Sequence, residues 1–313
     1  MKIIFMGTPA FAVPILDKIR EKHEVILVVT QPDVYNIKKK KFTHSEVKEY
    51  ALKNDLPLFQ PEKIRVDYQK IIDLDVDLIV TAAYGQIVPE EVLNHPKYKA
   101  INVHGSILPK YRGGAPIQRA IINGYKETGI TIMYMAKKMD AGDIIKISKI
   151  PILDTDNQDT VFSKLSILGS EMINDVISDI ANNKVTPIKQ NEEEVTFAYN
   201  LTKEDELINF HKTATEVFNQ IRGLNSNPGG HFTLDGINIK VYNSKVSLKH
   251  TDFKEGTIVD INKDSFDVAC KDGTVISILE LKIPSKNKMF VRDFMNGQGK
   301  NMIVKGKVIN QGE

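Results

Sequence analysis

Residues 2–30 read KIIFMGTPAFAVPILDKIREKHEVILVVT. The apolar run at residues 3–6 predicts a buried parallel strand, and the Gly-Thr-Pro turn after it predicts a helix over residues 10–22. A second apolar run at residues 25–29 predicts the next parallel strand. Such a strand-turn-helix-strand opening is typical of a Rossmann-like α/β sheet. Because the turn at Gly7 lacks the pattern Gly-x-Gly-x-x-Gly, we do not expect a nicotinamide dinucleotide.

The composition limits the class of protein. With 313 residues, 42% hydrophobic and 26% charged, the chain is expected to be a soluble protein of two domains. Its net charge of +2 neither demands nor excludes a nucleic-acid partner. The single cysteine, Cys270, excludes an internal disulfide and a cysteine-based metal cluster, and it fits the cytoplasm. We expect no signal peptide, no membrane span and no metal.

A second informative stretch begins as a short strand and ends in polar groups. It reads AINVHGSILPKYRGGAPIQRAII from Ala100 to Ile122. Asn102 and His104 are two residues apart, so both side chains point to the same side of an extended chain. Asp140 lies in a Gly-containing turn ahead of a later strand. If the three converge at the carboxyl edge of the sheet, they can polarise a carbonyl and move a proton. The alternative for His104 is a purely structural hydrogen bond.

Two loops border the same predicted edge. Residues 84–88, the stretch Tyr84-Gly85-Gln86-Ile87-Val88, follow a buried strand and could form an apolar wall for a flat heterocycle; alternatively they are an ordinary strand-to-helix connection. Residues 34–42 are expected to be a polar loop, and they contain Lys38, Lys39, Lys40 and Lys41. Four clustered cations can contact phosphates, but they are equally typical of a solvated loop.

The pattern changes in the second half of the chain. Residues 128–135 and 143–150 predict an antiparallel hairpin at the edge of the first sheet. We therefore predict a catalytic domain over residues 1–185, a linker over 186–203 and a second domain over 204–313. In the last segment, short strands separated by Asp-Gly turns predict a small OB-like β-barrel. Its lysines suit nucleic acid, but they are equally typical of an ordinary solvated surface.

These motifs resemble a known family. The residues that carry the likeness are Asn102-x-His104, the loop Ser106-Ile107-Leu108-Pro109, the segment from Arg112 to Ile121, and Met139-Asp140-Ala141-Gly142-Asp143. Together they closely resemble the 10-formyltetrahydrofolate-dependent formyltransferases, and the likeness covers nearly the whole chain. The α/β fold expected above agrees with it.

The resemblance implies specific roles. It implies formyl transfer from 10-formyltetrahydrofolate to the α-amino group of methionyl initiator tRNA. Separately, we expect the protein to be a monomer. Asn102, His104 and Asp140 would be the catalytic residues. The folate would contact Ser106, Ile107, Leu108 and Pro109 together with the 84–88 loop. The tRNA and its methionyl group would contact Thr8, Phe11, Arg112 and the four lysines.

Three other functions remain open from the sequence. An amino-sugar nucleotide could be the formyl acceptor, because such enzymes share the fold, the donor and the catalytic residues. A glycinamide ribonucleotide formyltransferase is disfavoured, because it would need only the first domain. A non-catalytic nucleic-acid-binding protein could use the second domain alone, but it would leave the Asn-x-His and Asp pattern unexplained.

Overall fold

The computed structural model describes residues 1–37 and 40–309. By their contacts, the residues form two compact units. The first consists of residues 1–116, 127–151 and 162–199, and the second of residues 117–126, 152–161 and 200–313. Within the described ranges, no helix has the length and hydropathy that a membrane crossing requires.

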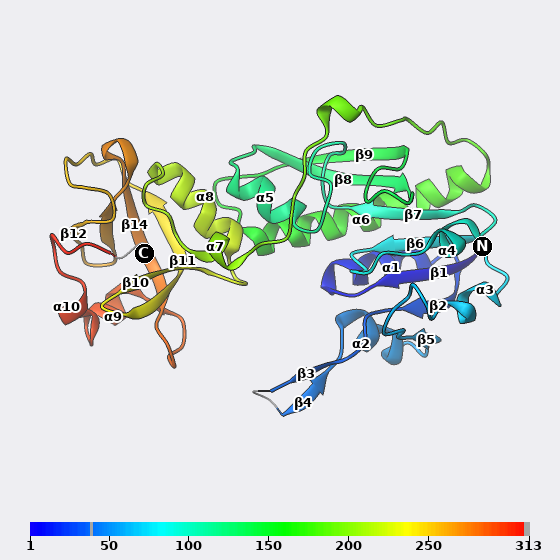
Figure 1. The fold of residues 1–313 in the computed structure, drawn as a ribbon, viewed down its shortest axis with the longest axis horizontal. Helices are drawn as coiled ribbons and strands as arrows, with labels where there is room; N and C mark the ends of the chain where they lie inside the picture. Colours follow the sequence, from blue (N-terminus) through cyan, green and yellow to red (C-terminus); the bar gives the residue numbers. More distant parts are fainter. Residues whose placement is uncertain (38–39, 310–313) are drawn as a thin grey trace. The chain divides into compact units, whose positions relative to one another are not determined.

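A seven-stranded sheet forms the centre of the first unit, in the order β5-β2-β1-β6-β7-β8-β9 (Figure 1). The strands from β5 to β7 are parallel, and β8 and β9 are antiparallel to their neighbours. The Rossmann-like opening predicted from the sequence is confirmed, and β8 with β9 forms the expected edge hairpin. The strands are β1 (Lys2–Gly7), β2 (Glu24–Val29), β5 (Leu58–Phe59), β6 (Leu78–Ala82), β7 (Ala100–His104), β8 (Glu127–Tyr134) and β9 (Ile144–Pro151).

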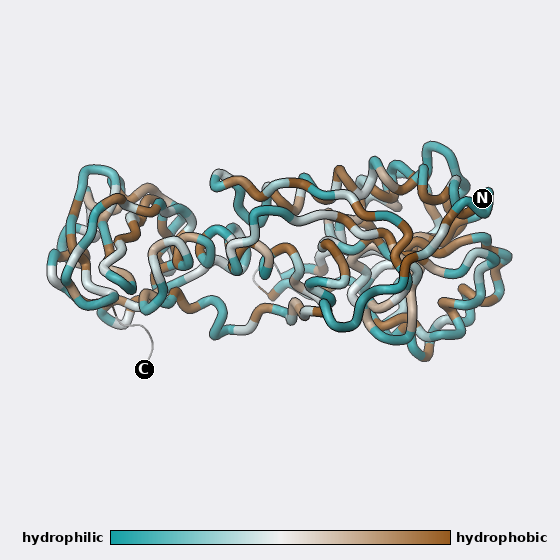
Figure 2. Tube along the Cα trace, turned by 90° about the horizontal axis from the view of Figure 1, so that it is seen from above, coloured by the Kyte–Doolittle hydropathy of each residue, from teal (hydrophilic) through white to brown (hydrophobic). Residues whose placement is uncertain are grey.

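Helices cover both faces of this sheet. On one face, Ile4 and Met6 of β1 pack in a cluster with Ile71 of α3 (Gln69–Ile72) and Val92 of α4 (Glu90–Asn94). Residues at alternate positions of a strand point to opposite faces, so the intervening side chains of β1 face the other helices. Figure 2 shows that the hydrophobic stretches of the chain lie inside the unit and that the hydrophilic ones lie in its outer loops.

The other face is covered by α1 (Val13–Arg20) and by the part of α6 (Gln158–Ala181) that belongs to the first unit. Gly169 allows α6 to approach closely, because a Cβ at this position would lie 3.0 Å from Cγ1 of Val103 and 3.3 Å from Cδ1 of Ile15. The hydroxyl of Ser166 donates to the carbonyl of Phe11 at 2.7 Å. The remaining helices of the unit include α2 (Glu46–Lys53), which begins at the capping residue Ser45.

The prediction of a polar loop over residues 34–42 is wrong. Strands β3 (Val34–Asn36) and β4 (Lys41–Thr43) form an antiparallel hairpin there. Tyr35 and Phe42 face each other in its register, with an edge-to-face ring contact at 5.2 Å. Aromatic cross-strand pairs stabilise such a two-stranded ribbon, and the lysine run concealed this signal. Lys38 and Lys39 lie outside the described residues.

The second unit contains a six-stranded antiparallel sheet in the order β10-β11-β14-β13-β12, with β15 paired to β14. Helix α8 (Ala214–Leu224) starts with a capping box at Thr213 and packs Val217 and Ile221 against the strands. The strands are β10 (Gly230–Leu234), β11 (Ile237–Val246), β12 (Ile258–Ile261), β13 (Phe266–Ala269), β14 (Val275–Lys282) and β15 (Met289–Phe290). The short helices of this unit are α5 (Pro116–Ile122), α7 (Lys203–Glu206), α9 (Val291–Met295) and α10 (Gly299–Met302).

The expected richness in antiparallel strands is confirmed, and so is the Asp235-Gly236 turn, where both residues adopt positive φ between β10 and β11. Among the described residues, no pairing joins β12 to β10, so the sheet is open rather than a closed barrel. The OB-like barrel therefore stays a prediction.

Candidate active site

Strand β7 delivers Asn102 and His104 to the carboxyl edge of the parallel strands, as the two-residue spacing predicts. The neighbouring strand β6 orients Asn102, because Thr81 lies opposite it in the parallel register. The hydroxyl of Thr81 donates to Oδ1 of Asn102 at 2.8 Å. This contact leaves Nδ2 of the half-buried amide as the group that can donate to a ligand.

His104 lies between a backbone carbonyl and a carboxylate. Its Nε2 donates to the carbonyl of Tyr111 at 3.0 Å, since a carbonyl oxygen can only accept. Its Nδ1 lies 3.7 Å from Oδ2 of Asp140, and the two side chains are only 7% and 13% exposed. Nδ1 is therefore the ring nitrogen that faces Asp140.

The turn between β8 and β9 holds Asp140 in place. The N–H of Gly113 donates to Oδ2 of Asp140 at 2.9 Å, so Oδ1 is the oxygen left to accept from a ligand. Asp140 itself adopts positive φ, at 50°. Gly142 is required two residues later, because a Cβ there would lie 1.8 Å from the carbonyl oxygen of Tyr134. The turn thus brings Asp140 to His104, although they are far apart in the sequence.

The 106–109 loop follows β7 and is fixed by β8. The hydroxyl of Thr131 donates to the carbonyl of Ser106 at 2.7 Å and accepts from the N–H of Leu108 at 3.1 Å. The side chain of Leu108 is buried with Met133 and Ile144. The bond between Leu108 and Pro109 is cis, and Ile107 is half-buried. These contacts give the loop a defined shape beside His104.

The 84–88 loop follows β6, the strand next to β7. The carbonyl of Tyr84 accepts from Oγ1 of Thr8 at 2.8 Å and from Nε2 of Gln31 at 3.2 Å. The side chain of Gln86 is bound by the N–H of Ile64 at 2.9 Å. These hydrogen bonds hold the backbone of the loop in place, and Gly85 within it adopts a positive φ of 88°.

One side chain of this loop fits a planar heterocyclic ligand, and another is buried in the core. Ile87 is 58% exposed while Val88 is buried, so the loop presents an apolar side chain to solvent. The hydroxyl of Tyr84 is buried and has no hydrogen-bond partner among the described residues. Burial raises the pKa of Tyr84 to about 12, so this hydroxyl stays protonated.

Arg112 and Phe11, two residues predicted to contact the tRNA or its methionyl group, are both buried. Arg112 is fully buried, and its guanidinium donates to Oε1 of Gln190 and to Glu192. Hydrogen bonds from Arg112 and Lys138 lower the pKa of Glu192 to about 2. Phe11 is 3% exposed and packs edge-on against Phe162. In this structure neither side chain presents a surface to a large substrate.

Three residues that orient the site were not expected from the sequence: Thr81, Tyr111 and Gly113. Thr81 contributes its hydroxyl, whereas the other two contribute a backbone carbonyl and a backbone N–H. The Gly113-Gly114 pair signals a backbone constraint, and Gly113 does adopt a φ of 122°. No sequence signal exists for the parallel register that places Thr81 beside Asn102.

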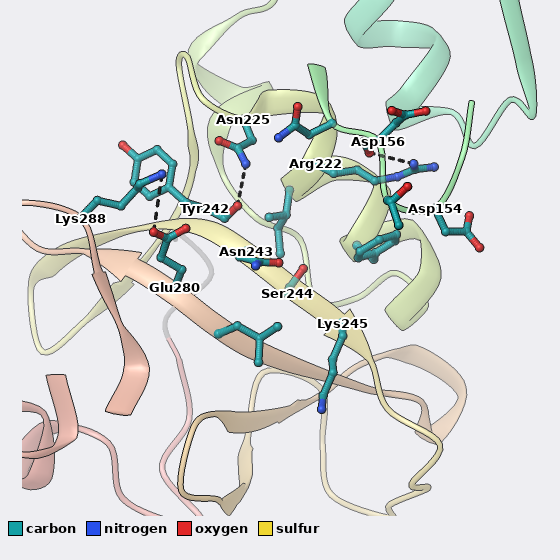
Figure 3. Close-up of a pocket in the computed structure, with 15 residues that line it drawn as sticks. Asp154, Asp156, Arg222, Asn225, Tyr242, Asn243, Ser244, Lys245, Glu280 and Lys288 are labelled. Carbon is teal, nitrogen blue, oxygen red and sulfur yellow. Dashed lines mark hydrogen bonds and ion pairs between the residues drawn. The ribbon is translucent and has the colours of Figure 1, made fainter. Parts of the chain in front are cut away.

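A separate pocket of about 540 Å³ lies within the second unit (Figure 3). Its lining includes Phe218 and Lys288, and the ammonium of Lys288 lies 3.5 Å from a carboxylate oxygen of Glu280. Arg222 is bound there by the carbonyls of residues 153 and 156. The pocket contains none of the predicted site residues. Within residues 1–37 and 40–309, no group of three or more His, Cys, Asp or Glu side chains is arranged to hold a metal.

Comparison with known proteins identifies the family. Residues 1–177 match the model of the formyl transferase domain, and residues 200–299 match the formyl transferase C-terminal domain. The chain belongs to the formyl transferase family, and the family assigned from the sequence motifs is confirmed.

Named relatives are similar over almost their full length. The methionyl-tRNA formyltransferase of Enterococcus faecalis is 47% identical over 310 residues, which are 98% of this chain and 99% of the relative. That of Listeria innocua is 45% identical over 303 residues, 96% and 97% of the two chains.

Solved structures share the fold at lower identity. The sugar 3N-formyl transferase WlaRD superposes with a TM-score of 0.70 at 22% identity, over 92% of this chain and 99% of the other. HypX from Aquifex aeolicus, solved with tetrahydrofolic acid, gives a TM-score of 0.67 at 16% identity, over 100% of this chain and 51% of the other.

Proposed function

We propose that this protein transfers the formyl group of 10-formyltetrahydrofolate to the α-amino group of methionyl initiator tRNA. The observation that carries the proposal is the pairing of His104 with Asp140, each held by a backbone group of the same loop. The two relatives named methionyl-tRNA formyltransferase support this acceptor.

In the proposed mechanism, Asn102 and His104 stabilise negative charge on the formyl oxygen. Nδ2 of Asn102 and the protonated Nδ1 of His104 donate to this oxygen as the amine attacks the formyl carbon. Asp140 stabilises the imidazolium and, directly or through a water, accepts the proton that the amine gives up at Oδ1. The bond between the new amide nitrogen and the formyl carbon forms, the bond to the donor nitrogen breaks, and that nitrogen regains a proton.

Two loops are proposed to bind the folate. Ile87 offers an exposed apolar side chain next to the fixed backbone of Tyr84, while the 106–109 loop lies beside His104. A bound folate would supply the activated formyl group. Isothermal titration with a non-reactive folate analogue tests this part: Ile87→Asp should weaken binding, and an unchanged affinity would contradict it.

The hairpin β3–β4 is proposed to contact the acceptor end of the tRNA through its lysines. Lys40 and Lys41 are exposed, and Lys38 and Lys39 adjoin them in the sequence. Replacing all four by alanine should weaken tRNA binding and reduce the slope of affinity against salt, because fewer counterions are released. An unaltered slope would contradict the assignment. Thr8 orients Tyr84, and Phe11 and Arg112 are proposed to position neighbouring groups rather than contact the tRNA.

The second unit is proposed to be an OB-like domain that supports the tRNA. We also propose that the protein acts in the cytoplasm, since its proposed substrate is a cytoplasmic RNA. We propose further that it is a monomer, which light scattering in solution tests.

The decisive experiment is a product assay. The protein is incubated with 10-formyltetrahydrofolate and methionyl initiator tRNA, and formylmethionyl-tRNA is detected by mass spectrometry. A parallel reaction contains a nucleotide-linked amino sugar, the acceptor suggested by the fold likeness to WlaRD. Formylation of the sugar but not of the tRNA would overturn the proposed acceptor. Formylation of neither, with no folate binding, would favour a non-catalytic protein.

A further inference from the structure

Phe197 and Tyr199 form an exposed aromatic pair next to the candidate active site. Their ring centroids are 5.7 Å apart and their planes differ by 13°, so the rings are stacked. Phe197 is 45% exposed and Tyr199 is 69% exposed. A single exposed aromatic needs no explanation, but two stacked and exposed rings form a planar apolar surface.

Backbone hydrogen bonds attach this pair to the loop that orients the catalytic residues. The N–H of Arg112 donates to the carbonyl of Thr196 at 2.9 Å, and the N–H of Ala198 donates to the carbonyl of Arg112 at 2.7 Å. The N–H of Ala115 in turn donates to the carbonyl of Ala198 at 3.0 Å. The segment therefore continues the structure that fixes His104 and Asp140.

Thr196 and Ala198 contact the 111–115 loop, although Thr196 is itself exposed. Ala198 is fully buried, and the hydroxyl of Thr196 accepts from the N–H of Tyr111 at 2.9 Å. In an extended chain the intervening side chains point the other way, so Phe197 and Tyr199 share the outer side. Gly113 permits the close approach, since a Cβ there would lie 2.7 Å from the carbonyl oxygen of Ala198.

We propose that Phe197 and Tyr199 stack with an unpaired nucleobase at the aminoacyl end of the tRNA. The inference rests on the proposed function and identifies how that substrate is positioned. The reacting amine is carried by an ester on the last nucleotide of the tRNA. The base of that nucleotide must therefore come close to the catalytic residues, where this pair is attached. Nucleobases stack on aromatic side chains whatever their identity, which suits an invariant single-stranded end.

One of the three glutamates that precede the aromatic pair is neutralised by cations, whereas Glu193 and Glu194 are exposed. Glu192 lies five residues before Phe197, and its charge is offset by Arg112 and Lys138 at 2.8 and 2.9 Å. The stacking surface itself is uncharged, so it would bind the base while the lysines proposed above contact phosphates.

The test compares two double variants with the intact protein. Phe197→Leu with Tyr199→Leu removes both rings and keeps apolar side chains; Phe197→Tyr with Tyr199→Phe keeps both rings. The leucine variant should raise the KM for methionyl-tRNA about 5–100-fold, the range expected for loss of base stacking, with kcat nearly unchanged. The ring-retaining variant should behave as wild type.

A binding assay isolates the aminoacyl end without requiring catalysis. Uncharged tRNA and the same tRNA trimmed of its unpaired 3′ nucleotides are titrated against each protein. Wild type should prefer the complete tRNA, and the leucine variant should bind both equally. Equal loss of affinity for both tRNAs, or no loss, would overturn the inference, as would a raised KM for the folate donor alone.

These outcomes are distinct from failure of the proposed function. If wild type made no formylmethionyl-tRNA, the proposed function would be wrong, and the binding comparison would still decide whether the rings recognise the 3′ end. Thermal unfolding of every variant shows whether a loss of binding reflects a loss of fold.

Discussion

Asp140→Asn separates the charge of Asp140 from its structural role. An asparagine oxygen can still accept from the N–H of Gly113, which lies 2.9 Å from the present carboxylate. What disappears is the negative charge 3.7 Å from Nδ1 of His104. The fold should therefore survive while the imidazolium loses its counterion.

The expected magnitude follows from this distance. Two unit charges 3.7 Å apart interact by about 4 kcal/mol at an effective dielectric constant of about 20, and the low exposure of both groups limits screening. If the imidazolium forms in the transition state, kcat should fall about 10²–10³-fold, since each 1.36 kcal/mol is tenfold in rate.

Initial rates of formylmethionyl-tRNA formation measure this effect, with Asp143→Asn as the matched control that removes a carboxylate from the same turn. Asp140→Ala should lower stability as well, by about 1–3 kcal/mol, because the N–H of Gly113 loses its acceptor. A folded Asp140→Asn variant with kcat within about threefold of wild type would refute the role of the charge.

Three further substitutions test other parts of the structure. Asn102→Ala should lower kcat about 10²–10³-fold at unchanged melting temperature, the usual effect of losing one oxyanion donor; near-normal initial rates would contradict it. Glu192→Gln should lower the melting temperature at neutral pH, and the difference should vanish as pH falls from about 4.5 towards about 2, because the folded pKa is depressed to about 2; Glu193→Gln is the control in these pH-dependent melts. Gly142→Ala should destabilise the protein, because its Cβ would lie 1.8 Å from a carbonyl oxygen, whereas Gly297→Ala, with its nearest atom at 3.7 Å, should not; circular-dichroism melts compare them.

The parts of the fold that follow from local sequence patterns were predictable. Apolar runs such as residues 25–29 indicate buried parallel strands, and Asp235-Gly236 indicates a hairpin whatever surrounds it. The β3–β4 hairpin was missed because its aromatic pair, Tyr35 and Phe42, is separated by lysines that are typical of loops.

The candidate site was predictable only as a set of side chains. Asn102 and His104 could be paired from their spacing, but the convergence of Asp140 depends on the tertiary path of the β8–β9 turn. The groups that orient them include the carbonyl of Tyr111 and the N–H of Gly113. Backbone groups occur at every residue, so sequence alone cannot show which ones are used.

One loop orients both His104 and Asp140, the two residues proposed to act together in catalysis. Tyr111 fixes the ring of His104 and Gly113 fixes Asp140, and only Arg112 lies between them. Because Arg112 is buried and bound to Glu192, a shift of its backbone would displace both contacts together. Substitutions of His104 and of Asp140 should therefore be non-additive, as expected for groups that act through one shared support.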